Sequence, residues 1–237
     1  EKYAYDFNHA GAKIAKEAKE EFCQNKKKSK IFVAGSIGPT NRTASLSPDV
    51  NDPAYRAVSF DNLVDCYSEQ VHGLIDGGVD ILFVETIFDT LNAKAALFAI
   101  DKIKSEKKLE IPIMVSGTIT DASGRTLSGQ TVEAFVIAIS HIPLLSIGFN
   151  CALGADQLLP YVKRLSKITD SYTSVHPNAG LPNAFGGYDQ TATEMSGLIE
   201  NYLKENIINI VGGCCGTKPE HIRLIAEVAR NYKPRKI

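Results

Sequence analysis

Two adjacent cysteines, Cys214 and Cys215, lie in the glycine-rich segment VGGCCGT at residues 211–217. The chain has only five cysteines, an odd and sparse set that does not predict a disulfide scaffold. Thiolates are soft ligands that favour zinc over magnesium or calcium, and neighbouring glycines let both sulfurs turn toward one metal. The pair can therefore bind a metal, form a vicinal disulfide, or simply be two small residues in a tight turn.

The elements that position these cysteines alternate along the chain. Helical patterns lie between short apolar runs, as in residues 60–77, where apolar side chains recur at spacings of three and four before Gly77-Gly78 ends the helix. Such alternation predicts a parallel sheet covered by helices. The β-branched runs predict six strands, at residues 31–35, 80–85, 111–117, 144–150, 172–176 and 208–213.

The first element decides between an open sheet and a barrel. The chain has no starting Met, and it opens with an amphipathic helix over about residues 6–24 that has no strand before it. Six strand–helix units suffice for a doubly wound sheet, whereas a barrel needs eight. One strand for this helix and one earlier unit would complete eight. We therefore expect an α/β fold, a (β/α)8 TIM-type barrel whose first strands are missing, with residues 1–237 forming one N-terminally truncated domain.

The carboxyl ends of barrel strands carry the functional residues. Cys151 follows the sixth strand of the complete barrel and Cys214 the eighth, so the three sulfurs can converge above the barrel mouth. Three thiolates without an obligatory fourth protein ligand form the kind of zinc site that keeps a position for substrate. The other polar residues at predicted strand ends, all candidates for substrate binding, are Ser36, Glu85, Thr118, Asn150 and Asn178.

Two of these residues have a structural interpretation beside the functional one. Glu85 ends the apolar strand DILFVE, where it can hold a substrate ammonium group or pair with an Arg or Lys at the rim. Asn178, in HPNAG, can offer its amide to metal or substrate, or can be an ordinary turn residue. The five histidines show no metal-ligand spacing, and we interpret Cys23 and Cys66 as small core or surface residues.

Composition excludes several classes of function. A net charge of −1 provides no broad basic field for nucleic acid, and no apolar run approaches the roughly 20 residues of a membrane span. The first residues resemble no signal peptide, so we expect a soluble cytoplasmic protein. The loops at residues 36–55 and 118–131 are much longer than the usual connections in such folds, so they are candidate lids or docking surfaces.

Taken together, six segments of the sequence resemble the homocysteine-binding domain of cobalamin-dependent methionine synthases, within the zinc-dependent homocysteine methyltransferase family. The resemblance covers residues 6 to 235. GGCCGT with an upstream Cys is shared by all members, whereas the loop at 117–131 and PNAGLPN point to the cobalamin-dependent enzymes. The segments are VGGCCGT (211–217), GFNCALG (148–154), HPNAGLPNAFG (176–186), GTITDASGRTLSGQT (117–131), GPTNRTASLSPDVNDPAYR (38–56) and VETIFDTLNAKAA (84–96).

This resemblance implies a catalytic zinc held by Cys151, Cys214 and Cys215, with the homocysteine sulfur in the open position. The homocysteine thiolate would then accept the methyl group of methylcobalamin, forming methionine. The resemblance also implies that Glu85 binds the substrate amino group and that Asn178 occupies the open zinc position before substrate arrives.

Parts of the family pattern have no match in this chain. The first strand–helix units, the methyltetrahydrofolate domain and the cobalamin-ligating signature Asp-x-His-x-x-Gly are absent from the sequence. We therefore expect a partial enzyme whose methylcobalamin is bound by another domain, with the cobalamin-binding and methyltetrahydrofolate-binding domains as partners. Three alternatives stay open: a cobalamin-independent homocysteine S-methyltransferase using betaine or S-methylmethionine, a phosphate-binding turn before a helix near Lys218, and a metal-storage or redox module.

Overall fold

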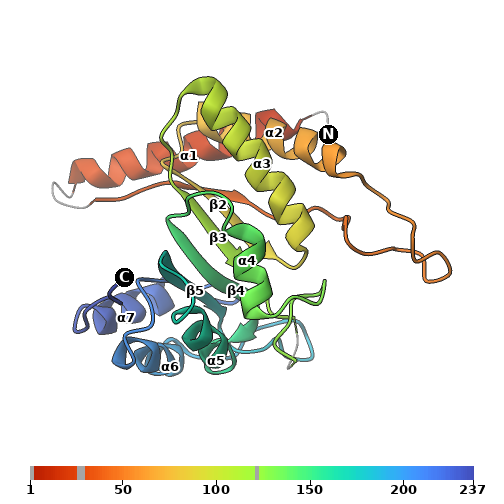
Figure 1. Cartoon of the computed structure of the whole chain (residues 1–237). Coiled ribbons are helices and arrows are strands. Elements are labelled where there is room, and N and C mark those ends of the chain that lie inside the picture. Colours follow the sequence, from red (N-terminus) through yellow and green to blue (C-terminus); the bar gives the residue numbers. More distant parts are fainter. Residues whose placement is uncertain (1–2, 26–29, 121–122) are drawn as a thin grey trace. The chain divides into compact units, whose positions relative to one another are not determined.

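The computed structural model describes residues 3–25, 30–120 and 123–237 (Figure 1). Within these ranges, strands and helices alternate as the sequence predicts. Their order is α1 (Ala4–Asn25), β1 (Ala34–Ile37), α2 (Phe60–Asp76), β2 (Ile81–Ile87), α3 (Thr90–Lys107), β3 (Ile113–Gly117), α4 (Val132–Ile139), β4 (Ser146–Gly154), α5 (Ala155–Leu165), β5 (Tyr172–Asn178), α6 (Ala192–Lys204), β6 (Ile210–Val211) and α7 (Pro219–Ala229).

The strands of the described residues form one parallel sheet in the order β1-β2-β3-β4-β5-β6. The predicted α/β fold and its six parallel strands are confirmed. Because β1 and β6 stand at the two ends of this order, the six described strands form an open sheet and do not close into a ring. The strand bounds lie within three residues of the prediction except at β4, which continues to Gly154, four residues beyond the predicted end.

Contacts between residues divide the chain into two compact units. The first comprises Glu1–Glu85 and Asp89–Met114, and the second comprises Thr86–Phe88 and Val115–Ile237. The assignment of residues 1–237 to one domain stays a prediction.

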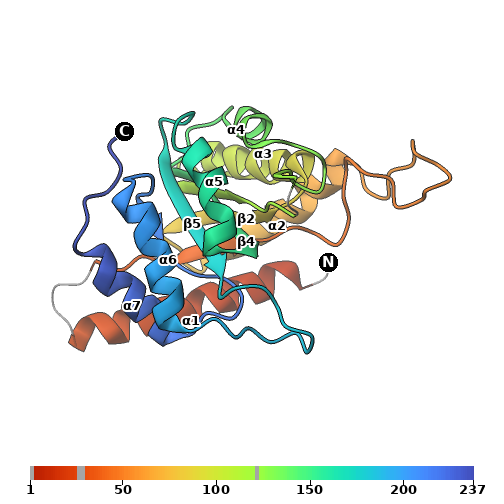
Figure 2. The same ribbon diagram turned by 90° about the horizontal axis from the view of Figure 1, so that it is seen from below.

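The first unit is built around α2, which lies beside both α1 and α3 (Figure 1). A capping box at Ser59 begins α2, and its side chains Leu63, Val71 and Leu74 are buried. Gly73 lets α1 approach closely, because a β-carbon there would lie 2.5 Å from the backbone oxygen of Tyr5. The outer part of the long connection between β1 and α2 extends away from these helices (Figures 1 and 2).

The second unit contains the end of β3, the strands β4 to β6 and the helices α4 to α7. In it, α5 packs on β4 and β5 and lies next to α6 (Figure 2). The rings of Phe135 in α4 and Phe149 in β4 lie 5.7 Å apart in the core. The buried hydroxyl of Tyr202 in α6 donates a hydrogen bond to the backbone oxygen of Ala155 at the start of α5. In the described part of the chain, no helix is both long enough and apolar enough to span a membrane.

Candidate metal centre

The sulfurs of Cys151, Cys214 and Cys215 lie within 4.8 Å of one another in the second unit. The Cys215 sulfur is 3.7 Å from that of Cys151 and 4.0 Å from that of Cys214. A zinc ion with Zn–S bonds of about 2.3 Å in tetrahedral geometry holds its sulfur ligands about 3.8 Å apart. The donor set and its spacing therefore fit a zinc ion bound by three thiolates.

A bulge at the end of β4 directs Cys151 into this cluster. Asn150 pairs with His176 and Gly154 with Asn178, so β4 uses two more residues than β5 over this interval. Cys151 and Ala152 have φ angles of 62° and 58°, in the left-handed region that residues with a β-carbon seldom adopt. Such strain often accompanies functional sites, and bulges commonly redirect a side chain there.

The end of β5 holds the turn that carries the other two cysteines. The backbone N–H of Cys214 donates to the oxygen of Pro177 at 2.8 Å, and that of Ala179 donates to the oxygen of Cys215 at 2.9 Å. The side-chain oxygen of Asn178 accepts from the backbone N–H of Cys215 at 3.1 Å. The predicted site residue Asn178 thus fixes the turn through its amide.

Asn150 is a fully buried residue that links three parts of the second unit. Its side-chain oxygen accepts from the backbone N–H of Thr86 at 2.9 Å, and its amide nitrogen donates to the Thr86 hydroxyl at 2.8 Å. The same nitrogen lies 3.9 Å from the Cys214 sulfur, and the Thr118 hydroxyl donates to the backbone oxygen of Asn150 at 3.0 Å. Of the predicted site residues, Asn150 therefore approaches the cluster and Thr118 contacts Asn150.

Burial disfavours the thiolate form of two of the three thiols, those of Cys151 and Cys214. Burial raises the pKa of Cys214 to about 12, and the charges of Cys151 and Cys215 add to this effect. Burial also raises the pKa of Cys151 above its ordinary value, although a hydrogen bond with the Ala152 backbone opposes the shift. A divalent cation reverses this balance because coordination favours the thiolate.

Ser36 and Glu85, the other predicted site residues, meet within the first unit. The Ser36 hydroxyl donates a hydrogen bond of 2.5 Å to the Glu85 carboxylate at the ends of β1 and β2. Ser36 is exposed and Glu85 half-buried. Glu85 thus lies near the carboxyl end of β2, which continues for two residues beyond the predicted end, to Ile87.

The loop at residues 36–55 is attached to the start of α3, a feature that its length did not reveal. The carboxylate of Asp89 accepts from the Ser45 hydroxyl at 2.6 Å and from the Ser45 backbone N–H at 2.9 Å. The side chain of Asn92 accepts from the Ala44 backbone and donates to the Arg42 oxygen. Both acceptors are almost fully buried, so residues 42–45 are a packed part of the first unit.

The loop at residues 118–131 is likewise anchored in the second unit, although residues 121 and 122 lie outside the described residues. The backbone N–H and the hydroxyl of Ser128 both donate to the Phe88 oxygen at 3.0 Å. The Thr118 N–H donates to the Ile87 oxygen at 2.8 Å. These contacts tie the loop to the end of β2.

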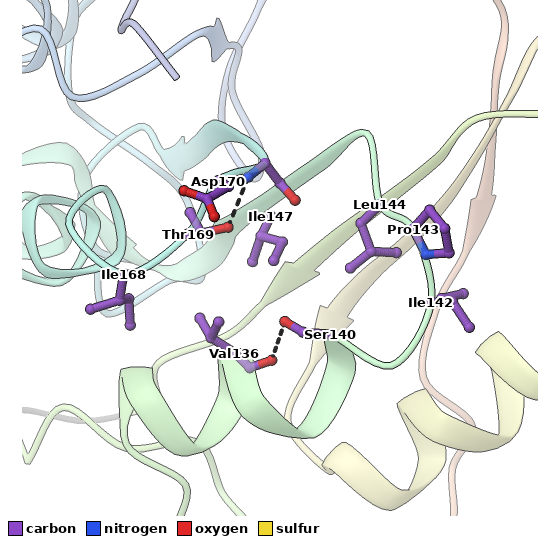
Figure 3. Close-up of a pocket in the computed structure, with 10 residues that line it drawn as sticks. Val136, Ser140, Ile142, Pro143, Leu144, Ile147, Ile168, Thr169 and Asp170 are labelled. Carbon is purple, nitrogen blue, oxygen red and sulfur yellow. Dashed lines mark hydrogen bonds between the residues drawn. The ribbon is translucent and has the colours of Figure 1, made fainter.

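A pocket of the second unit lies at the opposite end of β4 from Cys151 (Figure 3). Its lining mixes apolar and polar side chains and comes from the end of α4, the connection to β4, the start of β4 and the connection after α5. Since functional groups of parallel α/β folds gather at the carboxyl ends of strands, this pocket is distinct from the candidate site. Its lining includes Val136, Ser140, Leu144, Ile147 and Asp170.

Solved structures of one enzyme share this fold. The apo form of the homocysteine methyltransferase MmuM from Escherichia coli is 19% identical, with a TM-score of 0.70, covering 95% of this chain and 73% of that chain. Its metallated and oxidized forms are each 20% identical, with a TM-score of 0.71, covering 94% of this chain and 70% of theirs. The open sheet is thus similar to the TIM-barrel-type fold of that enzyme.

A family model extends the likeness from fold to sequence. The model for homocysteine S-methyltransferase matches residues 1–229, which include both the bulge of β4 and the cysteine turn. With three sulfurs gathered at these two positions, the chain belongs to the homocysteine S-methyltransferase family.

Proposed function

We propose that this chain binds homocysteine through a zinc ion held by Cys151, Cys214 and Cys215 and prepares its sulfur to accept a methyl group. The observation that carries this proposal is the gathering of the three sulfurs within 4.8 Å at the end of β4 and just beyond β6. A metallated form of the E. coli family member supports metal binding in this fold. The cysteines would hold the ion and leave one position for the substrate sulfur.

When bound, zinc supplies the positive charge that favours the thiolate form of homocysteine near neutral pH, where a thiol of pKa about 8.5 is mostly protonated. The chain's own residues position this chemistry. The bulge at Cys151 and the hydrogen bonds of Asn178 and Asn150 fix the directions of the sulfur ligands. A protein base for the substrate thiol is then unnecessary.

In this proposal, the carboxylate of Glu85 binds the ammonium group of homocysteine. The Glu85 carboxylate is held by the Ser36 hydroxyl, so that the pair presents an oriented anion at the end of β2. Charge-assisted hydrogen bonds of this type are about twice as strong as neutral ones. Thr118, Asn150 and Asn178 complete the proposed substrate-binding set, acting mainly by orienting the sulfur ligands.

Methylcobalamin is the methyl donor that we propose, bound by a domain outside this chain and giving methionine as the product. The support is the loop at residues 117–131 together with PNAGLPN at 177–183, which resemble cobalamin-dependent methionine synthases. The alternative is a cobalamin-independent homocysteine S-methyltransferase that uses betaine or S-methylmethionine. The two differ in the donor that must be added for turnover.

Zinc content and zinc-edge X-ray absorption test the site. We expect one zinc per chain with three sulfur neighbours, rising to four when homocysteine is added. Cys151→Ser should lose the metal, whereas Cys66→Ser, a half-buried cysteine in α2, should retain it. A sulfur count that homocysteine leaves unchanged would contradict the proposed substrate position.

Methyl transfer to homocysteine, measured in the protein as it occurs with each donor in turn, tests the donor. Methionine formed with methylcobalamin alone supports the cobalamin-dependent reaction. Methionine formed with betaine or S-methylmethionine in the absence of cobalamin would contradict the cobalamin-dependent reaction and support the cobalamin-independent alternative.

A further inference from the structure

Residues 179–190, here called the strap, join β5 to α6 and are fixed at both ends. At the start, the backbone N–H of Ala179 donates to the oxygen of Cys215. At the end, Nε2 of His221 lies 3.0 Å from the oxygen of Gln190. Because Nδ1 of His221 accepts from the Lys218 backbone N–H at 3.2 Å, Nε2 carries the proton and donates to Gln190. The strap is therefore tied to both sides of the cysteine turn.

Between these anchors, the strap folds back on itself around Asn183. The side-chain oxygen of Asn183 accepts from the backbone N–H groups of Phe185 and Gly187, each at 2.9 Å, and its amide nitrogen donates to Asp189. Its backbone N–H donates to the oxygen of Gly187 at 2.8 Å, and Pro182 forms a bridge with Tyr188. These contacts within the strap fix the backbone on both sides of Tyr188 and so determine where its side chain lies.

Tyr188 lies directly on the cysteine turn. Gly216 has a φ angle of 78°, and a β-carbon there would lie 2.3 Å from Cβ and 2.4 Å from Cγ of Tyr188. Only glycine permits so close an approach. The side chain of Tyr188 also forms a hydrogen bond with Cys215. A thiolate ligand has no proton to donate, so in the metal-bound site the phenol O–H is the donor.

Among the three cysteines, Cys215 depends most on contacts that hold its sulfur in place. Cys215 is exposed, whereas Cys151 and Cys214 are half-buried. An exposed thiolate ligand is the one that water and protons reach first, so it is the first point at which a metal is released. Hydrogen bonds from outside the ligand set orient metal ligands and tune the metal.

We propose that Tyr188 is a positioning residue that holds Cys215 in the metal-binding direction, through its ring on Gly216 and its hydroxyl on the sulfur. The inference rests on the proposed zinc site and adds to it a residue outside the ligand set. It predicts two separable contributions. The ring orders the turn whether or not metal is present, whereas the hydroxyl acts on the bound metal by drawing electron density from the thiolate.

Tyr188→Phe tests the hydroxyl. In a zinc competition titration, we expect its zinc affinity to fall about tenfold, the lower end of the effect of losing such a hydrogen bond. In the cobalt-substituted chain, the sulfur-to-metal charge-transfer band should move to longer wavelength, because a thiolate without its donor is more electron-rich. Tyr172→Phe, an exposed tyrosine at the start of β5, is the matched control and should change neither quantity. Wild-type zinc affinity and an unshifted band in Tyr188→Phe would overturn the role of the hydroxyl.

Tyr188→Ala tests the ring without any metal. In the metal-free chain, hydrogen exchange of the backbone amides in residues 211–217 should accelerate in Tyr188→Ala and stay unchanged in Tyr188→Phe. Exchange as slow in Tyr188→Ala as in the wild type would overturn the positioning role. If the wild-type chain binds no zinc, the proposed function fails, and this exchange measurement alone decides whether Tyr188 orders the turn.

Discussion

The side-chain oxygen of Asn178 accepts a hydrogen bond from the backbone N–H of Cys215, and the two atoms lie 3.1 Å apart. Asn178 is the last residue of β5 and is 2% exposed, so the sheet itself sets the position of the exposed cysteine. The amide acts on the backbone of the turn, which leaves the Cys215 sulfur available to a metal.

Asn178→Ala should therefore weaken zinc binding through the geometry of the turn. The substitution leaves the Cys215 N–H without its partner, at a cost of about 1–3 kcal/mol. We expect zinc affinity to fall about 10-fold to 100-fold, measured by competition with a chromogenic chelator. Asn231→Ala, at an exposed asparagine after α7, is the control. Unchanged zinc affinity in Asn178→Ala would refute this role.

Asp89→Ala should release the loop between β1 and α2. Asp89 is also the N-cap of α3, where it accepts from the Leu91 N–H at 2.8 Å, so its removal costs about 1 kcal/mol or more. A loss of 1 kcal/mol corresponds to about fivefold more of the open loop. Trypsin cleavage at Arg42 should accelerate by at least this factor, followed by mass spectrometry.

Asp49→Ala provides the comparison for this experiment. Asp49 lies in the same loop, where its carboxylate accepts from the backbone N–H of Asn51 and has no hydrogen bond to α3 among those described. Its removal should leave cleavage at Arg42 near the wild-type rate. Equal cleavage rates in the Asp89 and Asp49 variants would show that the buried hydrogen bonds do not hold the loop.

The strands could be predicted from the sequence because buried parallel strands form nearly continuous apolar runs. The end of β4 could not be predicted, since Cys151 and Ala152 adopt left-handed backbone angles that local sequence seldom signals outside glycine. This bulge is held by contacts with distant residues, such as the hydrogen bonds of Asn150 with Thr86. Tertiary contacts of this kind decide local geometry without leaving a periodic pattern.

The candidate site was partly visible in the sequence for a similar reason. Strand order alone brings the ends of β4 and β6 near each other, so the grouping of Cys151 with Cys214 could be expected. Asp89 and Tyr188 gave no such signal. Each acts across more than 25 residues of sequence on a loop or turn, and one sequence without three-dimensional contacts cannot identify that partner.

Stability should fall below pH 6.5 because of His176. Burial lowers the pKa of this largely buried imidazole from 6.5 to about 4. The folded state therefore disfavours the protonated form, and the unfolded state binds more protons as the pH falls from about 6.5 to 4. The free energy of unfolding should decrease over this window by at most about 3 kcal/mol.

Urea unfolding of the metal-free chain at pH 7 and pH 4.5 measures this effect. Removing metal matters because protonation of metal ligands would add its own pH dependence. His176→Gln should lose less stability between the two pH values than the wild type, whereas His141→Gln, at an exposed position after α4, should behave as the wild type. The same pH dependence in wild type and His176→Gln would exclude this imidazole as the cause.

Arg235 should stabilise the second unit from the end of the sheet opposite the cysteines. Its guanidinium donates to the backbone oxygen of Ser166, the C-cap of α5, and to those of Thr169 and Ser171 in the following connection. Hydrogen bonds from charged donors contribute about 1.5–3 kcal/mol, and a cation is favourable at a helix carboxyl end. Arg235→Ala should therefore lower the free energy of unfolding by about 2–3 kcal/mol in urea.

Arg235→Lys separates the geometry of the guanidinium from its charge. A lysine keeps the cation near the end of α5 but cannot reproduce the planar fork that reaches three carbonyl oxygens, so most of the loss should persist. Arg230→Ala, at an exposed arginine that caps α7, should cost much less. Zinc affinity should stay unchanged in all three variants, because Arg235 lies at the amino ends of β5 and β6 while the sulfurs lie beyond the carboxyl ends. Full stability in Arg235→Lys would instead assign the effect to charge alone.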